Sequence, residues 1–149
     1  MSSFTPYQLV DRPMYHLCVK DEWQAAVDSK KAYFPPTFEQ DKRKTHASMH
    51  SDKLVGTANF FYKASNPASV EWVCIELDPK CLLERVGIVT LVESPEPVGD
   101  HAAETTTTIR YPHIYGGIPT SVVGVVIKTY PMTRDPQDGT FLTIPGLFP

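Results

Sequence analysis

Apolar side chains recur at helical spacing in two stretches of the first half of the chain. In the first stretch, Trp23, Ala26 and Val27 follow Asp21, whose side chain can cap a helix in a capping-box pattern. This spacing predicts a short amphipathic helix over residues 21–31. The helix must end there because two consecutive prolines follow shortly afterwards, and proline cannot continue a helix.

The second stretch predicts a helix over residues 52–63. Ser51 can cap its start, and Asn66-Pro67 breaks the pattern after its end. The apolar positions that recur at helical spacing are Leu54, Val55, Ala58, Phe61 and Tyr62.

Runs rich in β-branched and aromatic residues predict strands. These runs are Met14–Val19, Val70–Leu77, Val86–Val92 and Val122–Tyr130. Asp138-Gly139 is typical of a turn, so Phe141-Leu142 is predicted to add a strand to a terminal hairpin. Because the strands do not alternate with crossover helices, we predict a single α+β domain over residues 1–149 rather than a doubly wound parallel sheet.

Two segments contain too many turn-forming residues for a regular element. Residues 93–108 combine acidic residues, prolines and a run of threonines, and predict a long surface loop. Tyr111–Pro119 contains Gly116-Gly117 between two prolines, and predicts a stiff, irregular wall of a functional cleft. We expect His113 or Tyr115 to point into that cleft.

Composition narrows the class of protein. A chain of 149 residues that is 42% hydrophobic and 21% charged is typical of one globular domain. A formal net charge of −3 gives no footprint for broad nucleic-acid binding. No apolar stretch is long enough to span a bilayer, and the first residues lack the pattern of a secretory signal. We therefore expect a cytoplasmic protein without nucleic-acid or membrane partners, whose oligomeric state stays open.

The three cysteines lack the CxxC spacing that a structural zinc site needs, and we expect them to be reduced thiols. They are Cys18, Cys74 and Cys81. Cys18 lies two residues from His16, on the same face of a predicted strand, so the two side chains can meet. Cys18 is therefore the one cysteine with a base beside it.

Histidine carries the candidate chemistry, because glycine-rich phosphate loops and common hydrolase and metalloprotease motifs are absent from the sequence. His16, His46 and His113 each lie close to hydroxyl residues, among them Ser48 and Tyr115. An imidazole with an ordinary pKa near 6.5 can give or take a proton at neutral pH. The spacing of these histidines matches no metal motif, so we expect no metal.

The order of several short motifs resembles the domain of unknown function 952 family over residues 14–142. The motifs are Tyr15-His16-Leu17 ahead of Trp23, Tyr33-x-Pro35, His46-x-Ser48, Ala58-Asn59-Phe60-Phe61-Tyr62, Tyr111-Pro112-His113-Ile114-Tyr115-Gly116 and Gly139-x-Phe141. Two features depart from the family pattern. Arg43-Lys44-Thr45 stands where the family usually has Gly-Phe-Ile, and the loop at 93–108 is longer than usual.

That family is in turn similar to the ADP-ribosyltransferase-like fold. The resemblance implies a mixed, split sheet in which His16 and His46 face one cleft, with NAD as a possible cofactor. The glutamate that many such transferases carry has no matching context in this sequence. Arg110 is a loose candidate for one of the arginines on which the tRNA 2′-phosphotransferase branch relies.

Three functions from different classes stay open. The first is an enzyme without a cofactor, in which one histidine removes a proton from a small organic metabolite and another returns it, giving an isomerisation, cyclisation or elimination. The second is a transferase that uses NAD or an ADP-ribosylated substrate, and the third is a non-catalytic ligand-binding or adaptor domain. The candidate catalytic residues are His16, His46 and His113, and the candidate substrate-binding residues are Ser48, Tyr115, Tyr33, Cys18 and Arg110.

Overall fold

The computed structural model describes residue 10, residues 12–93 and residues 111–147. In chain order its elements are β1 (Met14–Val19), α1 (Lys20–Ser29), β2 (Thr45–His46), the 3₁₀ turn η1 (Ser51–Lys53), α2 (Leu54–Phe61), β3 (Trp72–Leu77), α3 (Pro79–Cys81), the π-type turn η2 (Leu82–Val86), β4 (Thr90–Glu93), β5 (Tyr111–Ile114), β6 (Val126–Pro131), β7 (Thr133–Arg134) and β8 (Phe141–Thr143). Apart from residue 93, the loop predicted at 93–108 lies outside the described residues, as does Arg110.

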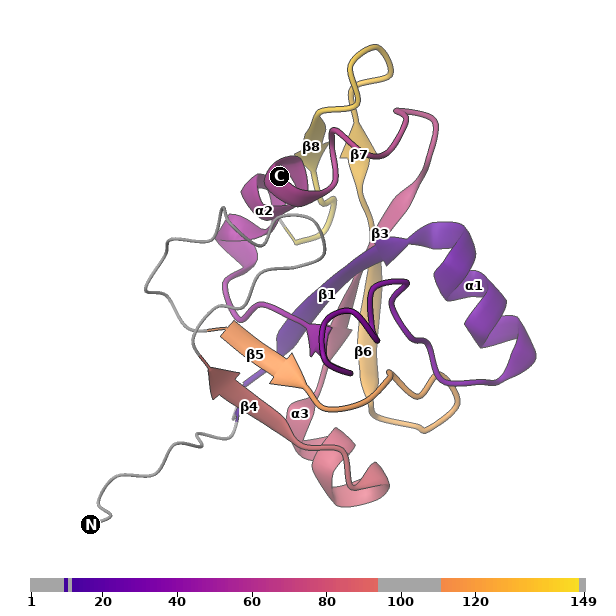
Figure 1. Cartoon of the computed structure of the whole chain (residues 1–149), viewed down its shortest axis with the longest axis vertical. Helices are drawn as coiled ribbons and strands as arrows, with labels where there is room; N and C mark the ends of the chain where they lie inside the picture. Colours follow the sequence, from indigo (N-terminus) through magenta and orange to yellow (C-terminus); the bar gives the residue numbers. More distant parts are fainter. Residues whose placement is uncertain (1–9, 11, 94–110, 148–149) are drawn as a thin grey trace.

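The central sheet has the strand order β1-β3-β6, and both of its faces are covered (Figure 1). On one face, Ile75 of β3 belongs to a core that includes Trp23 of α1. On the other face, Cys74 belongs to a second core with Leu54 of α2 and Phe141 of β8. Successive residues of a strand point to opposite faces, so burial on both sides explains why β3 is an almost continuous apolar run.

A second sheet has the strand order β2-β5-β4 and is joined to the central sheet through a backbone bridge. The Tyr15 N–H of β1 donates to the Ser48 carbonyl at 2.8 Å, and the Ser48 N–H donates to the Tyr15 carbonyl at 2.9 Å. Within the described ranges, this bridge covers only the start of the outer edge of β1. Residues His16–Val19 pair with β3 on one side, and no strand of the described residues pairs with them on the other side.

The terminal hairpin predicted around Asp138-Gly139 is confirmed as β7 and β8, which pair in antiparallel fashion. Gly139 adopts the left-handed conformation in its turn, at a φ of +80°. Helix α2 holds the hairpin through Asn59, whose Oδ1 accepts from the Phe141 N–H at 2.7 Å and whose Nδ2 donates to the Phe141 carbonyl at 3.0 Å. The Arg134 guanidinium donates to four backbone carbonyls at 2.7 to 3.0 Å.

Both predicted helices are confirmed, but neither starts with the predicted cap. Helix α1 begins at Lys20 behind Val19 and has no side-chain cap, so the capping role predicted for Asp21 is wrong. Ser51 lies inside η1, and no side chain caps that turn either. Among the helices of the described residues, none is both long and apolar enough to cross a membrane.

The predicted strands are confirmed with shifted boundaries. β1 matches its prediction, whereas β3 begins two residues late and β6 begins four residues late. β4 begins at Thr90 because the preceding residues Leu82–Val86 form η2. The chain enters that turn through Asp78, whose Oδ1 accepts from the backbone N–H groups of Lys80 and Cys81.

Two predictions about the sheets are corrected by the structure. The split into separate sheets is confirmed, but every described pairing is antiparallel, so a mixed sheet is wrong. Tyr111–Ile114 is not irregular: it forms β5, the middle strand of the second sheet. Pro112 has no N–H to donate, but its carbonyl accepts a hydrogen bond from the Ala47 N–H at 3.1 Å. Proline can therefore stand in this strand and still bond to the neighbouring segment.

Candidate functional site

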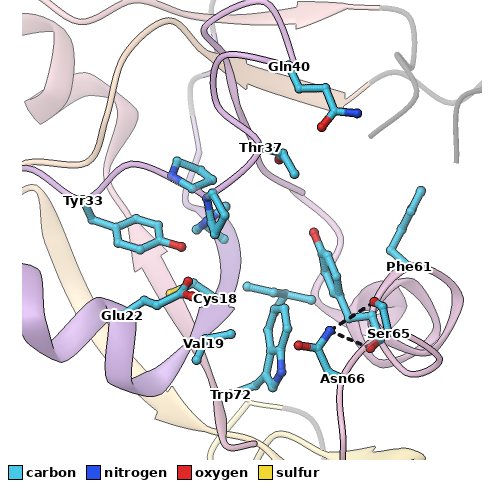
Figure 2. A pocket seen from close by; sticks show the side chains of 15 residues that line it. Cys18, Val19, Glu22, Tyr33, Thr37, Gln40, Phe61, Ser65, Asn66 and Trp72 are labelled. Atoms are coloured by element: carbon cyan, nitrogen blue, oxygen red, sulfur yellow. Dashed lines mark hydrogen bonds between the residues drawn. The ribbon is translucent and has the colours of Figure 1, made fainter. Parts of the chain in front are cut away.

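A cavity of about 290 Å³ opens where the outer edge of β1 lacks a strand partner among the described residues (Figure 2). Five segments supply its walls: the end of β1, the first turn of α1, residues 33–40, the end of α2 with the turn after it, and the start of β3. The lining residues are His16, Leu17, Cys18, Val19, Glu22, Tyr33, Pro35, Pro36, Thr37, Gln40, Phe61, Tyr62, Ser65, Asn66 and Trp72. Both faces of the central sheet contribute, so the cavity lies at the edge of this sheet.

His16 is buried in the wall of the cavity, and one hydrogen bond fixes its ring. Its Nδ1 lies 2.6 Å from the carbonyl oxygen of His46. Because a carbonyl only accepts, we assign the proton to Nδ1, which leaves Nε2 with a free lone pair. Burial lowers the pKa of His16 to about 4 even though the bond to His46 favours the charged form. The ring is therefore neutral at pH 7.

The Nε2 atom of His16 is buried and has no hydrogen-bond partner among the described residues. Leaving such a group unsatisfied costs about 1–3 kcal/mol, which a ligand with an N–H or O–H donor would recover. Less than 1 Å² of this atom is exposed, so a ligand reaches it only when a neighbouring side chain shifts. Tyr33 is such a neighbour, with its ring centroid 5.8 Å from that of His16.

Cys18 and Tyr33 form a neutral pair in the same wall. Burial is the main cause that raises the pKa of both groups, and each side chain also influences the pKa of the other. An activated cysteine has a lowered pKa, so this thiol suits contact with a ligand rather than nucleophilic attack. Figure 2 shows the Glu22 carboxylate gathered with Cys18 and the Tyr33 hydroxyl at one end of the cavity.

Tyr62 and Trp72 form an aromatic wall of the cavity. Their rings are stacked, with centroids 4.5 Å apart and planes inclined by 27°. Burial raises the pKa of Tyr62 to about 12, so its hydroxyl stays protonated. The indole Nε1 of Trp72 is a second buried polar atom without a hydrogen-bond partner in the described part of the chain. This wall offers a flat apolar surface to a ring or a short carbon chain.

His46 and His113 meet each other but do not line this cavity. They are direct partners in the register of β2 and β5, and their ring centroids lie 4.9 Å apart. His113 is completely buried, and His46 Nδ1 lies 3.7 Å from Asp41 Oδ2. His46 contacts His16 through its backbone carbonyl. The three predicted catalytic histidines are thus adjacent, but His16 alone reaches the cavity.

The remaining predicted site residues lie outside the cavity wall or outside the described residues. Ser48 is buried in the bridge to β1, and its hydroxyl accepts from the His50 N–H at 3.1 Å. Tyr115 lies on the surface with Lys44 Nζ 5.5 Å from its ring centroid, and Arg110 is not described. Across the described ranges, no group of three or more His, Cys, Asp or Glu side chains is placed to hold a metal ion.

Several lining residues were missed from the sequence. Tyr62 fits a helical stripe and Trp72 fits a strand, and neither pattern by itself indicates a site residue. Glu22 lies in the first turn of α1, where acidic residues are common for helix stability alone, so its position does not indicate a site. The motif Tyr33-x-Pro35 was the one available signal, because it places a ring and a stiff turn next to each other.

Comparisons with known proteins give a fold and a family. The structure is similar to the crystal structure of protein CC0527 from Caulobacter crescentus, with a TM-score of 0.58 and 16% identity over 88% of this chain and 94% of that chain. A double methionine variant of CC0527 matches with the same TM-score at 15% identity. No curated protein matches. Residues 17–126 match the family described as protein of unknown function (DUF952), so the chain belongs to the DUF952 family.

Proposed function

We propose that this protein is a cofactor-free enzyme that binds a small organic molecule in the cavity and uses His16 as the general base. The observation that carries the proposal is the lone pair of His16 Nε2, which is buried at the cavity wall without a hydrogen-bond partner among the described residues. A general base must be unprotonated and within reach of the proton that it removes. His16 meets the first condition at pH 7 because burial lowers its pKa.

The hydrogen bond to His46 prepares His16 for this role. The His46 carbonyl holds the Nδ1 proton, so the ring keeps its tautomer and its orientation while Nε2 accepts a proton from a C–H, O–H or N–H bond of the ligand. The electron pair of the broken bond stays on the ligand. The imidazolium that forms keeps its bond to the same carbonyl and is attracted by the new anion.

A reaction that uses a single base fits this arrangement. Because His46 and His113 do not line the cavity, His16 itself returns the proton, to a different atom in an isomerisation or to a leaving group in an elimination. The Tyr33 hydroxyl, whose raised pKa keeps it protonated, is a candidate donor to a developing oxyanion.

The two alternatives make different predictions for binding. A transferase of the ADP-ribosyltransferase-like fold needs space and positive charge for the pyrophosphate of NAD. The cavity is small, and its described lining contains neither lysine nor arginine. A non-catalytic binding domain would use the same cavity without any proton transfer.

The test begins with a thermal-shift screen of metabolites, NAD and ADP-ribose, because a ligand that binds the folded state raises Tm. For each ligand that binds, proton NMR in D2O measures the exchange of its C–H positions with solvent. His16→Asn keeps a donor near the place of Nδ1 and removes the Nε2 lone pair, so we expect exchange to slow by about 100-fold or more. His50→Asn, which makes the same change outside the cavity wall, is the control.

Three results would contradict the proposal. Equal exchange in His16→Asn and the wild type rejects His16 as the base. Binding without any exchange in the wild type indicates a non-catalytic domain. Stabilisation by NAD or ADP-ribose, with no effect of any other metabolite, favours the transferase.

A further inference from the structure

The cavity wall has an acidic residue but no positively charged side chain to balance it among the described residues. Of the described lining residues, Glu22 is the one carboxylic acid, with a pKa that burial raises, and none is a lysine or arginine. Figure 2 shows the Glu22 carboxylate facing the region of Cys18 and the Tyr33 hydroxyl. Its negative charge adds to the raised pKa of both neighbours, after the larger effect of their burial.

The cavity is also rich in aromatic rings. Besides His16, four of its lining residues are aromatic: Tyr33, Phe61, Tyr62 and Trp72. The face of an aromatic ring carries negative partial charge and attracts an organic cation, most strongly where water is excluded. A carboxylate together with several aromatic rings is the chemistry that recognises a protonated or quaternary amine.

His16 fits the same electrostatics. An imidazole with an ordinary pKa near 6.5 is positive part of the time around neutral pH and would then repel a cation. Burial keeps His16 neutral, so the base at the cavity wall does not oppose a positive ligand. Its Nε2 lone pair also accepts a hydrogen bond from an N–H or O–H group of that ligand.

We propose that the cavity selects organic cations, namely ring compounds that carry an amine, with the ammonium group at the Glu22 end and the ring on the Tyr62–Trp72 wall. This inference names the substrate class of the site and rests on the proposed function of that site. Carboxylates and phosphates are excluded, because each would lie beside the Glu22 carboxylate without a lysine or arginine among the described lining residues to offset it.

The experiment uses three indole probes that share a two-carbon chain and differ in the terminal group and its charge. Tryptamine is a cation, tryptophol is neutral and indole-3-propionate is an anion. Isothermal titration calorimetry measures Kd for each probe at pH 7 with the wild type, Glu22→Gln and Asp21→Asn. Asp21→Asn is the matched control, because it removes the same charge one residue away on the same exposed helix turn, outside the cavity wall.

We expect tryptamine to bind the wild type about tenfold more tightly than tryptophol, with indole-3-propionate the weakest. Glu22→Gln, with its Tm checked, should bring tryptamine and tryptophol to within about threefold of each other, while Asp21→Asn keeps the tenfold preference. If tryptophol or indole-3-propionate binds as tightly as tryptamine, selection for cations is wrong and the cavity still stands as a binding site. If no probe binds, the inference is overturned, and the metabolite screen with solvent exchange decides separately on the proposed function.

Discussion

The lowered pKa of His16 makes the stability of the protein depend on pH in a way that one substitution can isolate. In the unfolded chain a histidine binds a proton below its ordinary pKa of 6.5, whereas His16 in the folded protein binds one only below about 4. Between these two values the unfolded state holds more protons, so stability is complete above pH 6.5 and falls as the pH is lowered. Relative to pH 7, the loss due to His16 alone is about 2 kcal/mol at pH 5 and about 3 kcal/mol at pH 4.

The assay is urea denaturation of the wild type and His16→Asn at several pH values from 7 to 4. Carboxylates and other histidines titrate in both proteins, so the difference between their free energies of unfolding isolates His16. We expect the wild type to lose about 2 kcal/mol relative to the variant by pH 5, even if acid unfolding prevents measurement at pH 4. A difference that stays constant from pH 7 to pH 5 would refute the buried, neutral state of His16.

Three further predictions concern packing and hydrogen bonds, each measured as the free energy of unfolding in urea. Gly117→Ala places a methyl carbon 2.7 Å from the Tyr33 carbonyl oxygen and should lower stability by about 2 kcal/mol. Gly56→Ala in α2 meets no atom within 4 Å and should raise stability by up to about 1 kcal/mol. Equal effects of the two substitutions would contradict the close approach at Gly117. Arg134→Lys cannot reach four carbonyls at once and should cost about 2 kcal/mol, so a loss below about 0.5 kcal/mol would show that the guanidinium contacts are dispensable. Asn59→Ala removes both bonds to the β8 backbone and should cost about 2 kcal/mol, and an unchanged midpoint would contradict this role.

Local patterns predict well those elements that bury one apolar side against the core. The stripe of Trp23, Ala26 and Val27 is confirmed because α1 covers one face of the central sheet with that side. β5 was missed because Pro112 argues against a central strand when only the local sequence is considered. Its carbonyl, and not its absent N–H, bonds to Ala47 next to β2, and no local pattern reveals which group a distant strand will use.

The candidate site was predicted in part. His16, Cys18 and Tyr33, three of the predicted site residues, line the same cavity. His46 and His113 were expected in the same cleft, but they face each other because β2 and β5 pair in a register that brings the two residues opposite. A register between segments this far apart in sequence is a tertiary property. For this reason, the sequence indicates which residue types form the site but not which of them line the same cavity.

The outer edge of β1, which beyond Tyr15 has no strand partner among the described residues, bears on aggregation as well as on binding. An exposed strand edge is a template for another strand, and proteins commonly protect such edges with proline, charge or a covering loop. Here Pro35 and Pro36 line the same cavity as His16–Val19. Proline has no N–H to donate, so this segment cannot close the gap by pairing with β1 as a regular strand. The two prolines thus lie beside this edge without extending the sheet, and the cavity between them and β1 stays open.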